Sequence, residues 1–355
     1  MKKMAKVDTT KPVLVTGANG YVASWLVKRL VESGIHVHCA VRQPKNKGKV
    51  GHLEKLAENT EGKITFFQAD LLEKGAYKEA MKGCELVYHT ASPFTSNFND
   101  PQKDLIDPAV KGTENVLQTA TETDTVKKVV VTSSVAAMYT DAKDTVNAAG
   151  GELNEEVWNT TASLDYQPYS YSKLLAEKKA WEMADGQDQW KLVTINPSLV
   201  LGPPLNPKHT TSESMNILKM IGDGELKMGA PKLGIGLVDV RDVAEAHFLA
   251  GFDKNAKGRY LTSAHNTNLL EMAETLLKKY GQQYPLPTRA LPKWLLVLVG
   301  PLVNNQFSRK FIRNNVDIPF KANNSKVKKE LNLEFKPMKE TMEDSFQALI
   351  DGNIF

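Results

Sequence analysis

The sequence predicts an α/β protein in which a doubly wound parallel sheet is followed by a smaller C-terminal domain. Near the N-terminus, a strand, a glycine turn, a helix and a second strand succeed one another within about 30 residues. Short apolar runs then alternate with helical patterns as far as residue 200. Beyond Pro197, prolines and glycines cluster and the alternation loses its regular spacing, which predicts the change of domain.

The elements of the first domain follow from local patterns. Residues 12–15 form a short β-branched run that predicts the first strand. Helical spacing of apolar residues predicts a helix over residues 21–33, and Gly34 supplies its stop. A second strand is expected over residues 35–41. Four later apolar runs predict buried parallel strands, at residues 64–68, 86–89, 128–132 and 192–196.

The 355 residues exceed the length of about 250 to 300 at which single cores stop growing, so two domains are expected. We assign residues 11–201 to the first domain and expect residues 237–251 to return to it. Residues 202–345 are assigned mainly to the smaller domain, which we expect to cover the substrate.

The composition excludes several classes of function. Hydrophobic residues make up 41% and charged residues 24%, as in ordinary globular proteins. The net charge of +4 comes from scattered basic residues, so no nucleic-acid partner is expected. Cys39 and Cys84 have no metal-binding spacing, and two thiols in apolar stretches suit a reducing compartment. Because no apolar signal segment follows the first residues, we expect a cytoplasmic protein. The spacing of the cysteines and histidines predicts no metal site.

An apolar run near the C-terminus, residues 294–303, is about half as long as the ~20 residues needed to cross a bilayer. It also contains Gly300 and Pro301. We expect a helix in the core and no membrane insertion. A helix that gates the substrate or touches a membrane is the alternative.

The segment TGANGYVA, residues 16–23, has the composition of a phosphate-binding turn. Gly17 permits a tight turn, Gly20 permits close approach of the backbone to a pyrophosphate, and Ala23 permits close packing of helix and strand. The helix that follows offers unpaired N–H groups to an anion. Directly after the first strand, this segment predicts dinucleotide binding.

The end of the second strand indicates which dinucleotide is bound. An NAD site usually carries an acidic residue there, whereas this stretch contains no carboxylate and places Arg42 at the strand end with Lys49 nearby. Arginine recognises a 2′-phosphate, so we predict NADP(H). Solvated loop charges are the alternative. Asp70 is a candidate for the adenine contact, with a helix N-cap as its competing role.

Carbonyl reduction requires a proton donor, and two Tyr-x-x-x-Lys pairs could supply it. The pair Tyr169 and Lys173 opens a strongly helix-forming stretch, so that the two side chains share one face and the ammonium lowers the pKa of the phenol. The pair Tyr139 and Lys143 lies in a segment without a helical pattern, and we prefer the first pair. Ser134, at the end of a predicted strand, can hydrogen-bond the substrate oxygen and the Tyr169 hydroxyl; a strand-end cap is the alternative.

Together these motifs resemble a known family. TGANGYVA, HTASPF, VTSS, YSYSK and PSLVLGPP occur in the order found in extended short-chain dehydrogenase/reductases. The chain resembles their branch of dihydroflavonol reductases, cinnamoyl-CoA reductases and microbial aldehyde or ketone reductases over residues 12–353. The resemblance implies a Rossmann fold and a catalytic triad of Ser134, Tyr169 and Lys173.

The resemblance also implies binding residues. The expected cofactor ligands are Gly17, Asn19, Gly20, Tyr21, Val22, Arg42, Lys49, Asp70, Leu71, Thr90, Ala91, Pro93, Thr132, Pro197, Ser198 and Val200. The expected substrate pocket contains Phe94, Met138, Tyr139 and Met215, each of which could instead belong to the core.

The chain also departs from family patterns. Many relatives have an Asn in the helix behind the catalytic pair, where this sequence has Ala109. Cinnamoyl-CoA reductases typically carry a different string where this sequence has PYSYSK. Plant dihydroflavonol reductases place an Asn shortly after the strand serine, where this sequence has Met138 and Tyr139. We therefore expect an NADPH-dependent reductase of an aldehyde or ketone, as a monomer or homodimer. A nucleotide-sugar epimerase or dehydratase, a hydroxysteroid dehydrogenase and a non-catalytic NADP-binding sensor are the alternatives.

Overall fold

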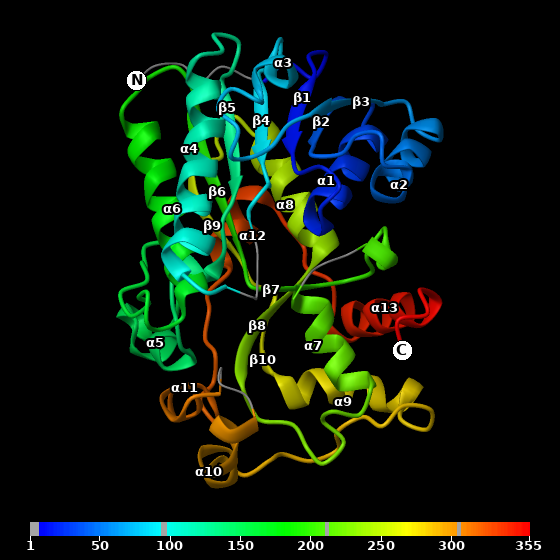
Figure 1. Ribbon diagram of the computed structural model, residues 1–355, viewed down its shortest axis with the longest axis vertical. Coiled ribbons are helices and arrows are strands. Elements are labelled where there is room, and N and C mark those ends of the chain that lie inside the picture. Colours follow the sequence, from blue (N-terminus) through cyan, green and yellow to red (C-terminus); the bar gives the residue numbers. More distant parts are fainter. Residues whose placement is uncertain (1–6, 94–97, 210–212, 304–306) are drawn as a thin grey trace.

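The computed structural model describes residues 7–93, 98–209, 213–303 and 307–355. Its main feature is a seven-stranded parallel sheet with the order β3-β2-β1-β4-β5-β6-β9 (Figure 1). The strands of this sheet are β1 Val13–Thr16, β2 His36–Val41, β3 Lys63–Gln68, β4 Leu86–His89, β5 Lys128–Thr132, β6 Lys191–Pro197 and β9 Gly258–Thr262. The predicted doubly wound fold is confirmed.

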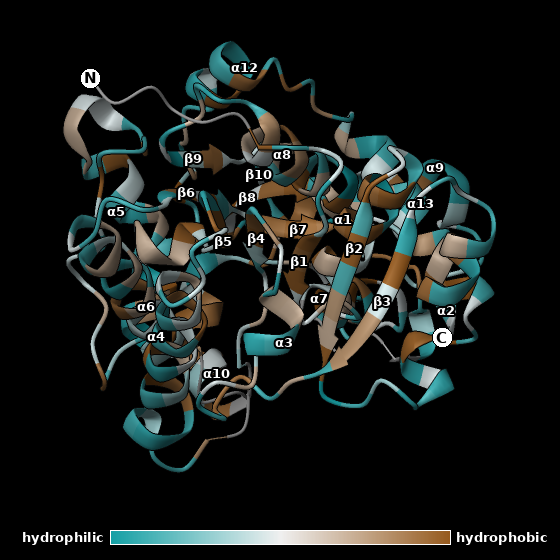
Figure 2. Ribbon diagram, turned by 90° about the horizontal axis from the view of Figure 1, so that it is seen from above, coloured by the Kyte–Doolittle hydropathy of each residue, from teal (hydrophilic) through white to brown (hydrophobic). Residues whose placement is uncertain are grey.

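Helices cover both faces of the large sheet, as Figure 2 shows from above. One face is packed by α1 Tyr21–Glu32, α2 Lys47–Glu58, α8 Val240–Phe252 and α12 Ser325–Leu331. The other is packed by α3 Lys78–Met81, α4 Asp107–Thr121 and α6 Pro168–Asp185. The strands in the middle of the sheet are buried on both sides, which explains why they are continuous apolar runs.

A second, smaller sheet lies beyond the carboxyl ends of the large one. It has the order β10-β8-β7, from β7 Leu199–Leu201, β8 Gly234–Asp239 and β10 His265–Asn268. Around it lie α7 Glu213–Gly222, α9 Leu269–Tyr280 and α13 Met338–Asp351, which share a separate hydrophobic cluster. The remaining helices are α5 Ala142–Asn147, α10 Lys293–Val303 and α11 Arg309–Asn315.

Two local expectations are wrong. The segment after Tyr139 contains helix α5, which begins after a capping box at Asp141. Tyr139 itself precedes this helix, so Tyr139 and Lys143 do not share a helical face. The run at residues 294–303 is helical, as expected, but it is not a core helix, because the side chain of Trp294 is 69% exposed and that of Leu302 is 85% exposed. No helix in the described part of the chain is long and apolar enough to cross a membrane.

The buried carboxylate of Asp141 joins three segments that are distant in sequence. It accepts hydrogen bonds from the hydroxyl of Tyr166 at 2.9 and 3.0 Å, just before α6. The side-chain amides of Asn314 and Asn315, in α11, donate to the same carboxylate at 2.8 and 2.6 Å. The start of α6 is therefore fixed to α11.

Asp242, in the first turn of α8, should make stability depend on pH. Burial raises the pKa of its carboxyl to about 7, and the N–H of Lys336 donates to it at 2.8 Å. The unfolded chain ionises this group at about pH 4, so the native state binds more protons between that value and pH 7, and stability falls as the pH rises. We expect Asp242→Asn, which cannot ionise, to resist denaturant better than the native protein at pH of about 8 and to lose this advantage at pH of about 4. An equal gain at both pH values, measured by urea unfolding, would contradict the assignment.

Candidate active site

The glycine turn between β1 and α1 forms the floor of the site. Gly17 has a φ of +61°, a left-handed conformation that favours glycine, and a Cβ there would come within 3.1 Å of Ala91. The N–H of Gly17 bonds the carbonyl of Ala40 at 2.8 Å, which fixes the turn to the end of β2. Helix α1 then begins without a side-chain cap and without an acidic residue in its first turn. Its first N–H groups therefore remain available to an anion.

A cavity of about 760 Å³ opens over this turn, at the carboxyl ends of β1, β2, β3 and β4. The expected cofactor ligands that line it are Gly17, Asn19, Gly20, Tyr21, Arg42, Lys49, Asp70, Leu71, Thr90, Ala91 and Pro93. The cavity lies where the strand order reverses between β1 and β4, the position at which doubly wound sheets bind ligands.

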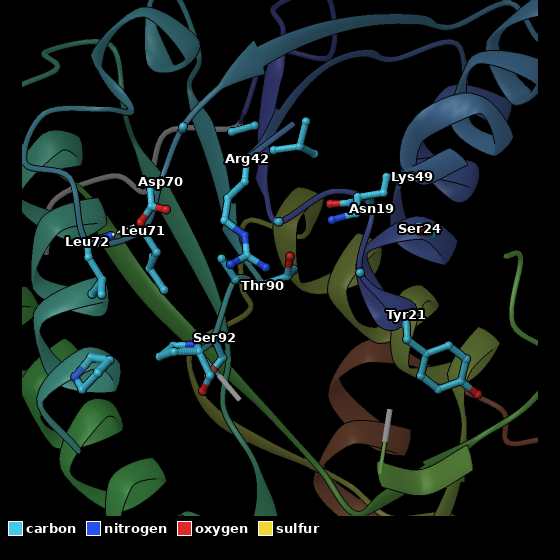
Figure 3. Close-up of a pocket in the computed structure, with 18 of the residues that line it drawn as sticks. Asn19, Tyr21, Ser24, Arg42, Lys49, Asp70, Leu71, Leu72, Thr90 and Ser92 are labelled. Carbon is cyan, nitrogen blue, oxygen red and sulfur yellow. Dashed lines mark hydrogen bonds between the residues drawn. The ribbon is translucent and has the colours of Figure 1, made fainter. Parts of the chain in front are cut away.

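Basic side chains line one part of this cavity. Arg42 extends across it from the end of β2, with Asn19 and Lys49 on one side and Asp70 on the other (Figure 3). Lys208, from the segment after β7, is a further cation among the lining residues. In the described part of the lining, three cations accompany the two carboxylates of Asp70 and Asp104. This arrangement favours an anionic ligand.

The loop after β3 is held by α4. The carboxylate of Asp70 accepts a hydrogen bond from the N–H of Leu72 at 2.9 Å, which closes a turn rather than capping a helix. The side-chain amide of Asn115 donates to the carbonyl of Leu71 at 3.0 Å. Leu71 packs so closely against Gly112 that a Cβ added to this glycine would lie 2.6 Å from the leucine side chain. Asn115 and Gly112 therefore position the residues expected at the adenine.

A buried hydroxyl joins β1 to the segment after β4. Thr16 Oγ1 accepts hydrogen bonds from the N–H groups of Thr90 at 3.1 Å and Ala91 at 3.0 Å. His89 Nδ1 lies 3.0 Å from the same oxygen, and burial, together with the charge of Lys173, lowers the pKa of this histidine to about 3. A neutral His89 thus helps to fix the wall of the cavity.

The predicted triad is brought together at the carboxyl end of β5. Ser134 hydrogen-bonds the hydroxyl of Tyr169, and its own oxygen also accepts the N–H of Ala136 at 3.1 Å. The serine therefore caps the strand end, and its catalytic role stays a prediction. Tyr169 and Lys173 lie one turn apart on α6, and the ammonium is 5.6 Å from the centroid of the tyrosine ring. Lys173 Nζ donates to Ser92 Oγ at 2.8 Å, which links the triad to the cavity wall.

The pKa of Tyr169 shifts in the direction opposite to our expectation. Burial raises the pKa of Tyr169 to about 12, although the hydrogen bond with Ser134 opposes the shift. The expectation that Lys173 brings the pKa of the phenol below its ordinary value is therefore wrong, because desolvation of the phenolate is the largest cause of the shift. Burial also lowers the pKa of Lys173 to about 8. Near neutral pH the tyrosine is protonated and the lysine is mostly charged.

A second buried carboxylate lies one turn further along the same face of α6. Glu177 is 2% exposed and accepts hydrogen bonds from Asn196 at 2.7 Å and from the hydroxyl of Ser133. Arg259 of β9 donates to it at 2.7 Å and also bonds the carbonyls of Glu155 and Val157. Asn196 bonds the carbonyl of Ser134 as well, at 3.2 Å. This network fixes α6 to the strand end that carries Ser134.

The other predicted residues lie outside the cavity lining. Val22 is in the first turn of α1, and Thr132 bonds His247 of α8 at 2.7 Å. At the end of β6 lie Pro197 and Ser198, followed by Val200 in β7. Within the described part of the chain, the buried hydroxyl of Ser198 has no hydrogen-bond partner.

Of the predicted substrate residues, Met138 and Met215 are buried in hydrophobic clusters, and Tyr139 packs against Phe320. Phe94 lies outside the described residues. Several lining residues were not predicted: Ser24, Ala40, Val41, Ala69, Leu72, Tyr77, Ser92, Asp104, Pro108, Leu205, Asn206 and Lys208. Only Ser92, inside the HTASPF motif, had a local sequence signal.

The chain is similar in sequence to a known family and to plant reductases. Residues 13–260 match the NAD dependent epimerase/dehydratase family. The chain is 35% identical over 349 residues to a cinnamoyl-CoA reductase of Medicago truncatula, covering 98% of each chain. It is 36% identical over 281 residues to the anthocyanidin reductase of Arabidopsis thaliana, covering 76% of this chain and 81% of the relative.

Solved structures give the same result. The yeast methylglyoxal/isovaleraldehyde reductase Gre2, complexed with NADPH, superposes with a TM-score of 0.77 at 26% identity, covering 96% of this chain and 99% of that one. The expected resemblance is confirmed. The chain belongs to the NAD dependent epimerase/dehydratase family, among the oxidoreductases of the extended short-chain dehydrogenase/reductase type.

Proposed function

We propose that this protein is an NADP(H)-dependent carbonyl reductase that converts an aldehyde or ketone to an alcohol, with Tyr169 as the proton donor. The observation that carries the proposal is the hydrogen bond between Lys173 and Ser92, because it supports a position of the proposed triad, Ser134, Tyr169 and Lys173, beside the cavity that would bind the dinucleotide. The named relatives are reductases, which supports the same reaction type.

The residues present fit a phosphorylated dinucleotide. The turn at Gly17 and Gly20 leaves room that a Cβ would fill, and the first N–H groups of α1 would donate to a phosphate. Arg42 and Lys49 would hold the 2′-phosphate. The unpartnered hydroxyl of Ser198 would meet the nicotinamide end. When bound, the reduced cofactor supplies the hydride for the carbonyl carbon.

The protein's own residues would handle the proton. With a pKa of about 12, Tyr169 holds its proton at neutral pH and can donate it to the carbonyl oxygen. Ser134, bonded to the same hydroxyl, orients it and can donate to the oxygen as negative charge develops. The ammonium of Lys173, mostly charged below pH 8, stabilises the phenolate that remains.

We also propose that residues 202–345 mainly form the cover over the substrate. Two hydrogen bonds fasten the start of this region to α1: Tyr21 donates to the carbonyl of Gly202 at 2.7 Å, and Trp25 donates to that of Pro203 at 2.8 Å. The substrate pocket would include Met138, Tyr139 and Met215 only indirectly, as side chains of hydrophobic clusters that support the residues at its surface.

Replacing Arg42 with Ala should change cofactor preference. Loss of charge-assisted hydrogen bonds to the 2′-phosphate should weaken NADPH binding about 10- to 100-fold and leave NADH binding nearly unchanged. Fluorescence titration with both cofactors measures the two dissociation constants. Lys45→Ala removes an exposed cation from the same loop, outside the cavity lining, and serves as the control. Equal losses for both cofactors would contradict recognition of the phosphate by Arg42.

The proposed function is tested by mixing the purified protein with NADPH and a panel of aldehydes, ketones and diketones, and following the absorbance of the reduced cofactor. We expect consumption of NADPH with at least one carbonyl class, and slower consumption of NADH. If NADPH binds but no carbonyl is reduced, the proposal is wrong.

A further inference from the structure

Helix α10 exposes an apolar stripe to solvent. Trp294, Leu298 and Leu302 are 69%, 60% and 85% exposed, and Val299, beside Leu298, is 39% exposed. A spacing of four residues places the side chains of Trp294, Leu298 and Leu302 on one face of the helix. The helix lies at the end of the molecule away from α3 and the N-terminal strands (Figure 1). Large exposed apolar side chains gathered on one helix indicate an interaction surface.

The stretch of sequence that contains this stripe, between Glu274 and Asp317, carries only basic charges. Residues 275–316 contain no Asp or Glu, although Asp and Glu number 41 in the whole chain against 45 Lys and Arg. The same stretch carries seven cations: Lys278, Lys279, Arg289, Lys293, Arg309, Lys310 and Arg313. The partner of this surface must therefore accept both apolar contact and positive charge.

The cations of α11 lie directly beside the stripe. Arg309 and Arg313 are exposed and line, with Trp294, Val297 and Leu298, a shallow depression of about 380 Å³. The positive charges of these arginines and the apolar side chains of α10 therefore lie side by side on one surface.

The two helices are held together firmly. Lys293 Nζ, at the start of α10, donates to the carbonyls of Arg313, in the last turn of α11, and of Val316, just after this helix, at 3.1 and 2.6 Å. Ile312 of α11 approaches Gly300 so closely that a Cβ added to this glycine would lie 2.8 Å from the isoleucine side chain. The stripe and its basic border are thus presented as one preformed surface.

We propose that α10 and α11 form a docking surface for an anionic membrane, with α10 lying in the plane of the interface. The apolar stripe would enter the boundary between headgroups and acyl chains, where tryptophan is favoured. Arg309 and Arg313 would contact lipid phosphates, and the basic stretch around them would add attraction to an anionic leaflet. Helix α10 has 11 residues, about half the ~20 needed to span, so the protein would lie on the membrane.

A second copy of the chain fits this surface poorly. In a two-fold contact the same patch faces itself, so Arg309 and Arg313 of one copy would approach those of the other. The described residues that line the depression beside the stripe include no carboxylate to neutralise them. A layer of lipid phosphates supplies the missing negative charge.

The test uses the full-length protein in flotation assays with vesicles of phosphatidylcholine alone or mixed with phosphatidylglycerol. We expect binding to the mixed vesicles at least tenfold tighter than to the neutral ones, and weaker binding as salt is raised. Arg309→Gln with Arg313→Gln should remove most of the salt dependence. Leu298→Gln with Leu302→Gln should weaken binding to mixed vesicles at least tenfold.

Leu72→Gln is the matched control for vesicle binding, because this leucine is 55% exposed in the cofactor cavity, outside the docking surface. Its vesicle affinity should equal that of the native protein. Absence of binding, equal binding to both vesicle types, or equal losses in the control and the stripe variant would each overturn the proposal. A concentration-dependent dimer in light scattering that Leu298→Gln with Leu302→Gln abolishes would also overturn it, in favour of a second copy.

Discussion

Tyr169→Phe should lower the turnover of the reductase about 100- to 10,000-fold, the range that general acid catalysis contributes. The substitution removes only the hydroxyl that would protonate the carbonyl oxygen. Because Tyr169 does not line the dinucleotide cavity, the dissociation constant of NADPH should stay within about twofold of the native value. Steady-state kinetics with the best carbonyl and a separate cofactor titration measure the two effects.

Tyr171→Phe is the matched control, since it removes the same atom from the same helix two residues away, where the side chain points in a different direction. It should retain nearly native turnover. Undiminished turnover in Tyr169→Phe would exclude this phenol as the proton donor, while equal losses in both variants would indicate damage to α6 rather than lost catalysis.

Glu177→Gln should have the largest effect on stability. The substitution keeps the shape of the side chain but removes the carboxylate that forms an ion pair with the buried guanidinium of Arg259. It also places an amide N–H₂ group among partners that donate hydrogen bonds, such as Ser133 and Asn196. Removing one member of a buried ion pair costs about 3 to 5 kcal/mol, and we expect the free energy of unfolding to fall by that amount in urea.

The exposed pair on the same helix provides the comparison. Glu182, which is 69% exposed, contacts Lys179 at 2.8 Å, and Glu182→Gln should change the free energy of unfolding by less than about 1 kcal/mol. If the two variants were equally stable, Arg259 could not depend on Glu177 for its burial.

The sequence was most informative where structure is local. The runs at residues 86–89 and 128–132 match β4 and β5, because a strand buried on both faces must be apolar throughout. The glycine turn and the Tyr169–Lys173 pair were also predictable, since each depends on spacing within a few residues.

Contacts between distant segments could not be predicted in this way. Strand β9 was missed because its Arg259 looks like a surface residue until Glu177, 82 positions earlier, is seen opposite it. Lys208 reaches the cavity from a segment that has no phosphate-binding motif. Helix α10 was expected in the core because apolar composition alone does not say which side chains the rest of the chain covers.

The hydrogen bonds that Tyr166, Asn314 and Asn315 donate to Asp141 have a consequence for protein synthesis. Two of the three donors, Asn314 and Asn315, leave the ribosome long after α6 has been made. A nascent chain that ends before them lacks the tether between the start of α6 and α11. Premature release of the polypeptide would therefore leave the segment before Tyr169 without these two hydrogen bonds, which form only near the completion of translation.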